Sequence, residues 1–155
     1  MANTNAFTGV YECWRNMFEI EVEGEWVPIA DMEQFSVTVD GEVVEWKPYD
    51  MQGWPRRLKT GNSITVSSTG KRNVGDVGND AVAAFDVALG TGKACEKNFR
   101  IVAPTNDYIE MHNTVINAKQ FGLGGATTEV SALEFEALSN GKPTFGKKTE
   151  TDTGV

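Results

Sequence analysis

Apolar and acidic residues alternate between residues 17 and 29, MFEIEVEGEWVPI. One phase of the alternation is apolar (Phe18, Ile20, Val22) and the other is acidic (Glu19, Glu21, Glu23). A period of two residues predicts a β-strand with one buried face and one solvated face. Gly24 predicts a tight turn, after which Trp26 and Val27 begin a returning strand.

A second alternating run, FSVTVDGEVVEW, covers residues 35–46. Asp40-Gly41 lies between its two apolar halves, and Asp-Gly is a strong signal for the type I′ turn of a two-residue hairpin. We therefore predict a β-hairpin over residues 35–46. A further β-like segment is expected from Arg57 to Ser68.

The connection between these segments, KPYDMQGWPRR at residues 47–57, is long and carries large apolar side chains. Its two prolines exclude it from the interior of a sheet. Tyr49, Met51 and Trp54 are costly to expose together. Two interpretations stay open: the loop folds back on its own domain, or it forms a contact surface for another subunit.

The only convincing helical pattern lies at residues 80–90, DAVAAFDVALG. Asn79 or Asp80 is the expected N-cap, and Gly90 suits a left-handed C-terminal cap. One face of the helix is apolar (Val82, Phe85, Leu89). The preceding stretch, SSTGKRNVGDVGND at residues 67–80, is predicted to be a strand end, a turn and the start of this helix. Its glycines at positions 70, 75 and 78 are expected to permit positive φ or a close approach.

The C-terminal half again has strand patterns. Two strands are predicted within residues 98–104 and 107–121, and GLGG at 122–125 breaks the chain. Alternation over 128–138 predicts a long strand with a bulge near Ala132. The polar tail from Gly141 is expected to be a mobile end or an arm that orders on assembly.

These patterns sum to about eight strands and one helix. We predict a mainly β fold, a sandwich or partly closed barrel, with one flanking α-helix and extended loop and terminal arms. The length of 155 residues suits a single domain over 1–155.

Composition narrows the function further. A net charge of −8 argues against a partner held through phosphate neutralisation, but not against a passage through which nucleic acid slides without sticking. Cys13 and Cys95 are far apart and are expected to be reduced. The N-terminus lacks a signal-peptide pattern and no segment approaches the ~20 apolar residues that span a bilayer. We expect a soluble protein that is intracellular when made.

Motifs for catalysis or cofactor binding are weak. Neither GKRNVGDVGND nor GTGKA at residues 90–94 has the order of a phosphate-binding loop. Asp76, Asn79 and Asp80 lack the spacing of a calcium loop, and a capped helix with a turn explains them. His112 stands alone, without the partners of a catalytic triad or a zinc site. We therefore predict no enzyme activity, no cofactor and no metal site.

The order of the segments resembles the major tail tube proteins of long-tailed (siphovirus-type) bacteriophages and phage-like particles. The resemblance rests on DGEVVEWKPYDMQGWPRRLKTGNSITVSSTGKRNVGDVGNDAVAAF, residues 40–85, and GGATTEVSALEFEALSNGKPTFG, residues 124–146. It covers most of residues 30–145, and GKRNVGDVGNDAVA is its most specific part.

The resemblance implies a β-sandwich with a flanking helix, whose subunits close into hexameric rings that stack into a hollow tube for genome passage. It also implies tape measure, tail tip and tail terminator proteins as partners, transient non-specific DNA passage, and no membrane binding by the chain itself. The protein is then expected in the virion tail, after synthesis in the cytoplasm of a bacterial host.

Two sets of site residues follow. The loop 47–57 and the tail 141–155 are expected to bridge rings, and charge reversal at Arg72 is expected to weaken ring stacking without unfolding the monomer. The candidate contacts between subunits or rings are Trp46, Tyr49, Met51, Trp54, Arg56, Arg57, Lys71 and Arg72. The candidate lumen-facing acids, which would repel DNA, are Glu19, Glu21, Glu23, Glu134 and Glu136. The sequence leaves open whether strand 18–23 or strand 130–138 lines the lumen.

Other functions stay open at this stage. A monomeric β-sandwich virion decoration or binding module would use Trp46, Tyr49 and Trp54 to hold a ligand. A small hydrolase on a β scaffold would need a His-centred constellation. The tube of a contractile injection machine shares the fold. Self-association separates a tube from the first two alternatives.

Overall fold

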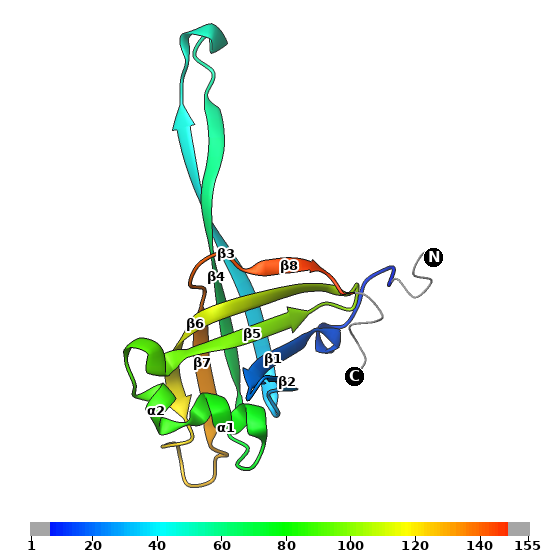
Figure 1. Cartoon of the computed structure of the whole chain (residues 1–155), viewed down its shortest axis with the longest axis vertical. Helices are drawn as coiled ribbons and strands as arrows, with labels where there is room; N and C mark the ends of the chain where they lie inside the picture. Colours follow the sequence, from blue (N-terminus) through cyan, green and yellow to red (C-terminus); the bar gives the residue numbers. More distant parts are fainter. Residues whose placement is uncertain (1–6, 149–155) are drawn as a thin grey trace.

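A computed structural model describes residues 7–148 of the chain. This range contains eight strands and two short helices, with three single 3₁₀ turns (Figure 1). The strands are β1 Met17–Val22, β2 Glu25–Pro28, β3 Met32–Trp46, β4 Arg56–Lys71, β5 Glu96–Val102, β6 Asp107–Phe121, β7 Ala132–Leu138 and β8 Thr144–Lys147. The helices are α1 Val77–Ala83 and α2 Phe85–Ala88.

All strands belong to one antiparallel sheet, in the order β2-β1-β5-β6-β7-β4-β3, with β8 paired to the start of β6. The sheet is not closed, because its end strands do not pair with each other. It curls until Phe18 of β1 stacks on Phe35 of β3, with ring centroids 5.2 Å apart. The mainly β prediction is confirmed. One twisted, curled sheet, rather than two separate layers, encloses the core.

Aromatic side chains fill the inside of the curl. The ring of Phe18 lies 5.2–6.2 Å from the rings of Phe35, Phe99 and Phe135. Val82 of α1 and Val87 of α2 are buried in the same cluster, so both helices cover this side of the sheet. Burying each large apolar side chain contributes about 1.5–3 kcal/mol. The opposite side, called the bare face below, carries no α-helix among the described residues.

The predicted helix over 80–90 needs correction. Two short helices take its place, separated at Ala84, whose ψ of 137° is not helical. The first begins at Val77 because Asp76 is the N-cap: its carboxylate accepts a hydrogen bond from the backbone N–H of Asn79. The N-cap prediction of Asn79 or Asp80 is therefore wrong. Gly90 is not left-handed; a Cβ there would meet the carbonyl oxygen of Asp86 at 2.1 Å.

The C-terminal segment is ordered further than its composition suggested. Residues 144–147 form β8, which pairs with Asp107–Glu110 of β6. The first part of the predicted flexible arm is thus a strand of the sheet. Residues 149–155 of that arm lie outside the described residues. The predicted strand 128–138 is also shorter, because β7 begins at Ala132.

Candidate assembly surfaces

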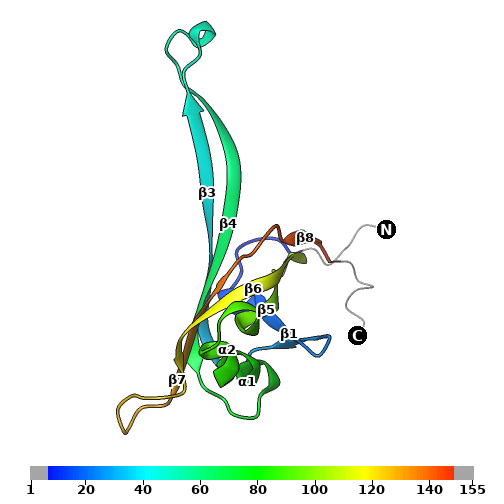
Figure 2. The same ribbon diagram turned by 60° about the vertical axis from the view of Figure 1, so that its left-hand side comes forward.

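A long two-stranded arm extends from the body of the molecule (Figures 1 and 2). Strands β3 and β4 pair along their whole length, but only residues 65–71 of β4 also pair with β7. Residues 40–63, called the arm below, therefore consist of the two strands and their connection alone. No residue of the arm is buried. An isolated two-stranded hairpin is marginally stable in water, so the arm needs a covering partner.

The turn of this hairpin is not where the sequence predicted it. Asp40 and Gly41 lie within β3 and pair with Ser63 and Asn62 of β4. The chain reverses instead at residues 47–55, with a 3₁₀ turn at Tyr49–Met51. The Asp-Gly turn does not form, because the long strand β4 pairs with β3 on both sides of Asp40-Gly41.

The predicted contact residues of the loop 47–57 lie at the tip of the arm and beside it. Tyr49 is fully exposed, and the side chains of Trp54, Trp46 and Met51 are 74%, 44% and 38% exposed. Arg57 pairs with Glu45 across the two strands, with 3.4 Å between Nε and the carboxylate. Arg56 has no ion pair with a described residue. The structure thus excludes a loop folded back on its own core.

Lys71 and Arg72 contact partners within their own chain. Lys71 makes an exposed ion pair of 3.1 Å with Glu33. Arg72 is largely buried, and its Nη1 donates to Asp80 Oδ1 at 2.8 Å and to Asn79 Oδ1 at 2.9 Å. Arg72 therefore has partners within its own chain, and the expectation that its charge reversal weakens ring stacking without unfolding the monomer stays a prediction.

Asn79 is the centre of this network. It is fully buried, and its side-chain amide donates to the carbonyl oxygens of Ala30 and Lys71 at 3.0 Å each. The N-cap Asp76 also accepts from the backbone N–H of Ala30. The segment GKRNVGDVGND thus ties the end of β4, the turn before β3 and helix α1 together. The Arg72 hydrogen bond lowers the pKa of Asp80 below its ordinary value.

The three glycines of this segment serve the purposes expected of them. Gly75 has a φ of +101°. A Cβ on Gly70 would meet the carbonyl oxygen of Asp31 at 2.4 Å, and one on Gly78 would meet that of Pro28 at 2.3 Å. Both are contacts with backbone, which a rotamer change cannot relieve.

We expect Gly78→Ala to lower the free energy of unfolding by about 2–3 kcal/mol, because the backbone of α1 must move away from Pro28. Urea unfolding of the monomer measures this. Gly61→Ala is the matched control: the nearest atom to its Cβ would be a side-chain oxygen of Glu42 at 3.9 Å. An equal loss for both variants would contradict the close-packing explanation.

The candidate lumen acids all lie on the bare face or at its edge, but they differ in their surroundings. Glu19 is buried, and its carboxylate accepts two hydrogen bonds from Arg100, at 2.7 and 2.9 Å. The expected solvated row on strand 18–23 is thus wrong at this position. Glu21 accepts a hydrogen bond from Asn98, whereas Glu23 is exposed at the turn before β2.

Glu134 and Glu136 belong to β7, where Leu133, Phe135 and Ala137 point to the core. Both glutamates therefore lie on the bare face, half-buried, between the polar strands β4 and β6. Lys119 lies 3.6 Å from the carboxylate of Glu136. The apolar residues that alternate with these glutamates in β1 and in β7 belong to the same core cluster. The glutamates of both strands therefore lie on the opposite face of the sheet.

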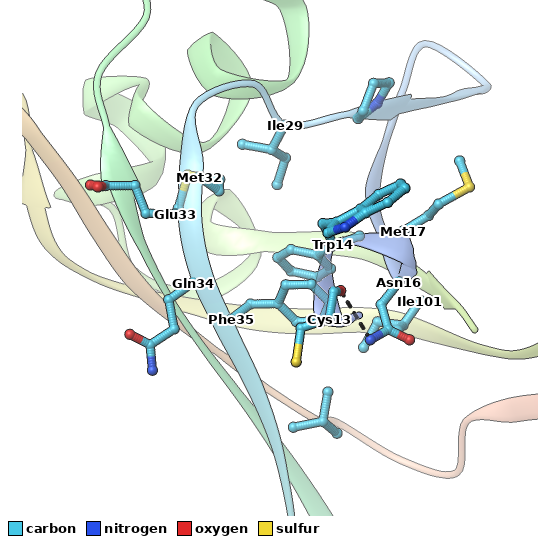
Figure 3. Close-up of a pocket in the computed structure, with 13 residues that line it drawn as sticks. Cys13, Trp14, Asn16, Met17, Ile29, Met32, Glu33, Gln34, Phe35 and Ile101 are labelled. Atoms are coloured by element: carbon cyan, nitrogen blue, oxygen red, sulfur yellow. Dashed lines mark hydrogen bonds between the residues drawn. The ribbon is translucent and has the colours of Figure 1, made fainter. Parts of the chain in front are cut away.

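A cavity of about 720 Å³ lies in the open seam between β1 and β3 (Figure 3). Trp14, Ile29, Phe35 and Ile101 contribute to its lining, together with Glu33 at the edge of β3. Sequence reasoning missed this cavity. Its walls come from segments far apart in the chain, which only the curl of the sheet brings together.

Two properties of the described range bear on function. Residues 7–148 contain no group of three or more His, Cys, Asp or Glu side chains placed to hold a metal ion. The same range contains no helix long and apolar enough to cross a membrane.

Solved structures match this architecture over nearly the whole chain. A chain from the tail of an empty gene transfer agent (GTA) particle, solved with C6 symmetry, gives a TM-score of 0.70 at 16% identity, covering 88% of this chain and 99% of that one. A chain of the native gene transfer agent virion gives 0.66 at 15% identity, with the same coverage.

This chain has the fold of tail tube proteins. A chain from the sheath–tube complex of an extracellular contractile injection system, PVC, in its extended state, gives a TM-score of 0.58 at 9% identity, covering 96% of this chain and 100% of that one. The tail-tube fold therefore matches chains from both kinds of particle, and the resemblance inferred from the sequence is confirmed at the level of the fold. No protein-family model and no curated protein matches the sequence.

Proposed function

We propose that the protein is a structural component of a particle tail, which self-assembles into stacked hexameric rings that form a hollow tube for genome passage into a host. The arm carries this proposal, because residues 40–63 expose aromatic and aliphatic side chains without a core of their own. Tryptophan and tyrosine are the residues that most often anchor interfaces. The tail-tube fold supports a second copy of the chain as the partner.

Unpaired sheet edges favour closure into a ring. Within residues 7–148, β3 pairs only with β4, and β2 and β8 each have one partner strand. Different edges on one subunit suit head-to-tail contacts, which form a ring when the rotation closes. The C6 symmetry of the gene transfer agent tail supports six copies in that ring.

The bare face is the surface that best fits a lumen. It carries Glu21, Glu110, Glu134 and Glu136 and the Glu19–Arg100 pair, without a covering helix. Acidic side chains repel the phosphates of DNA, so nucleic acid would pass without being held. On this proposal Glu134 contributes more than Glu19 and Glu136, whose charges are offset by Arg100 and Lys119.

The remaining assignments follow from the same role. Tape measure, tail tip and tail terminator proteins are the proposed partners, the virion tail is the proposed location, and the role is structural rather than enzymatic. A tube of a contractile injection machine is the second candidate, favoured by the match to the PVC sheath–tube complex, which spans 96% of this chain.

Sedimentation velocity over a concentration series, with tryptophan emission recorded in parallel, tests the proposal. We expect large species above a critical concentration, with a blue shift as Trp46 and Trp54 lose their exposure to water. A monomeric binding module would instead sediment near its mass of 16.9 kDa at every concentration, with unchanged emission.

A further inference from the structure

We propose that the tip of the arm docks on the helical end of the next copy, defined as residues 73–91 with helices α1 and α2. This inference rests on the proposed tube, and it adds the surface that receives the arm. The two surfaces lie toward opposite ends of the molecule, with the arm at the top of both views and the helices in the lower part, above the loop that joins β6 to β7 (Figures 1 and 2). Stacking of identical copies in one direction brings unlike ends together.

Large apolar side chains are exposed at both of these ends, although Trp14, Met17 and Phe145 are also exposed elsewhere on the described chain. The arm carries Trp46, Tyr49 and Trp54, and the helical end carries Val74, Val77, Phe85 and Leu89, which are 53–81% exposed. Side chains of α1 and α2 that pack on the core, such as Val82 and Val87, are separate from this set. Val74, Val77 and Leu89 are therefore surplus to the fold of the monomer, whereas the partly exposed ring of Phe85 also packs edge-on against Phe121, with 5.5 Å between ring centroids. Large exposed apolar groups gathered at one end mark a contact surface.

The charges of the two ends are complementary. Residues 45–59 carry four basic residues and two acidic ones, although the whole chain has a net charge of −8. Residues 73–91 carry three aspartates and neither Lys nor Arg. Asp76 and Asp80 are engaged within the chain, whereas the exposed Asp86 has no ion pair with a described residue. Arg56 and Lys47 at the tip are the corresponding cations, which make no ion pair within residues 7–148.

The seam cavity is the competing receiver for the arm. Its lining is also apolar, but Glu33 is its only acidic residue and already pairs with Lys71. The helical end therefore offers the better electrostatic match to a basic tip.

Cysteine crosslinking in assembled material tests the contact. One chain combines Asp50→Cys at the tip with Thr91→Cys after α2, and Cys13 is replaced by serine. Positions 50 and 91 are exposed, and neither is one of the aromatic or apolar residues proposed to make the contact. A short bis-maleimide should produce a head-to-tail ladder of crosslinked chains. Asp50→Cys with Cys13 retained tests the seam cavity instead, because Cys13 lines it. We expect at least about a fivefold stronger ladder for the first pair.

A charge exchange gives an independent readout. Arg56→Asp and Asp86→Arg should each raise the critical concentration for assembly about fivefold, and the double variant should recover most of that loss. Tubes that form while the Asp50→Cys/Thr91→Cys pair stays uncrosslinked, or a ladder through Cys13 instead, would overturn the docking site and leave the tube intact. Wild-type protein that never assembles would remove the proposed function, and the docking site with it.

Discussion

Shortening the arm should abolish assembly and leave the monomer folded. We expect this for the variant in which residues 42–61 are replaced by Asn-Gly, joining Gly41 to Asn62, which face each other in the β3–β4 register. The replaced residues contain no buried side chain, so the core is untouched. They contain most of the exposed aromatic anchors, each of which can contribute about 2 kcal/mol or more to an interface. Loss of two such anchors raises a dissociation constant roughly a thousandfold.

Sedimentation velocity measures the assembly, and thermal unfolding followed by circular dichroism measures the fold. The matched control is Thr60→Ala, which changes an exposed arm residue without removing an aromatic anchor. Assembly of the shortened variant at the wild-type critical concentration would contradict the role given to the arm. A large fall in the melting temperature of the monomer would show instead that the arm stabilises its own chain.

Arg72→Glu should destabilise the monomer by about 2–4 kcal/mol. The substitution removes the donor to the buried Asn79 and to the half-exposed Asp80, and it places a third acidic group beside two carboxylates, Asp76 and Asp80. Urea unfolding of protein kept below its critical concentration measures the loss. The adjacent Lys71→Glu is the control, because its ion pair with Glu33 is exposed and should cost no more than about 1 kcal/mol.

Acid titration adds a second readout. Arg72 lowers the pKa of Asp80 in the folded protein, so ionised Asp80 stabilises the fold above its ordinary pKa near 3.8. That contribution is lost as the pH falls through the lowered folded pKa. The wild type should therefore lose stability in this acidic range, and Arg72→Glu should lose less there because the contribution is already missing. Equal stability of the Arg72→Glu and Lys71→Glu variants would contradict the network.

Local sequence patterns predicted many of the strands and part of the core. Period-two alternation located β1 and β7 and identified the core residue Phe18, and strand patterns located β5 and β6. The glycines at 70 and 78 were also predictable, because a strand end and a helix start meet there. Alternation depends on neighbouring residues in the sequence, which is where local propensity is informative. The backbone atoms that Gly70 and Gly78 approach, in Asp31 and Pro28, are distant in the sequence.

The features that the sequence did not predict depend on long-range pairing. The Asp40-Gly41 pair favours a turn until β4 pairs with fourteen residues of β3 on both sides of it, with a register shift between Glu42 and Val43. Glu19 reads as a solvated acid until β5 brings Arg100 beside it. Arg72 reads as a surface cation until α1 folds back and places Asn79 and Asp80 against it. In each case the residue or strand that determines the outcome is distant in the sequence, or its side chain is oriented by tertiary packing. A local sequence pattern contains neither kind of information.

Electron microscopy of the purified, concentrated protein near physiological salt tests the central claim most directly. We predict hollow tubes with a regular axial repeat, six-fold symmetry in end views, arms that reach from one ring to the next, and the bare face of the sheet toward the lumen. Compact particles without a channel, or isolated monomers at every concentration with the arm uncovered, would contradict the assignment of this chain as a self-assembling tube protein.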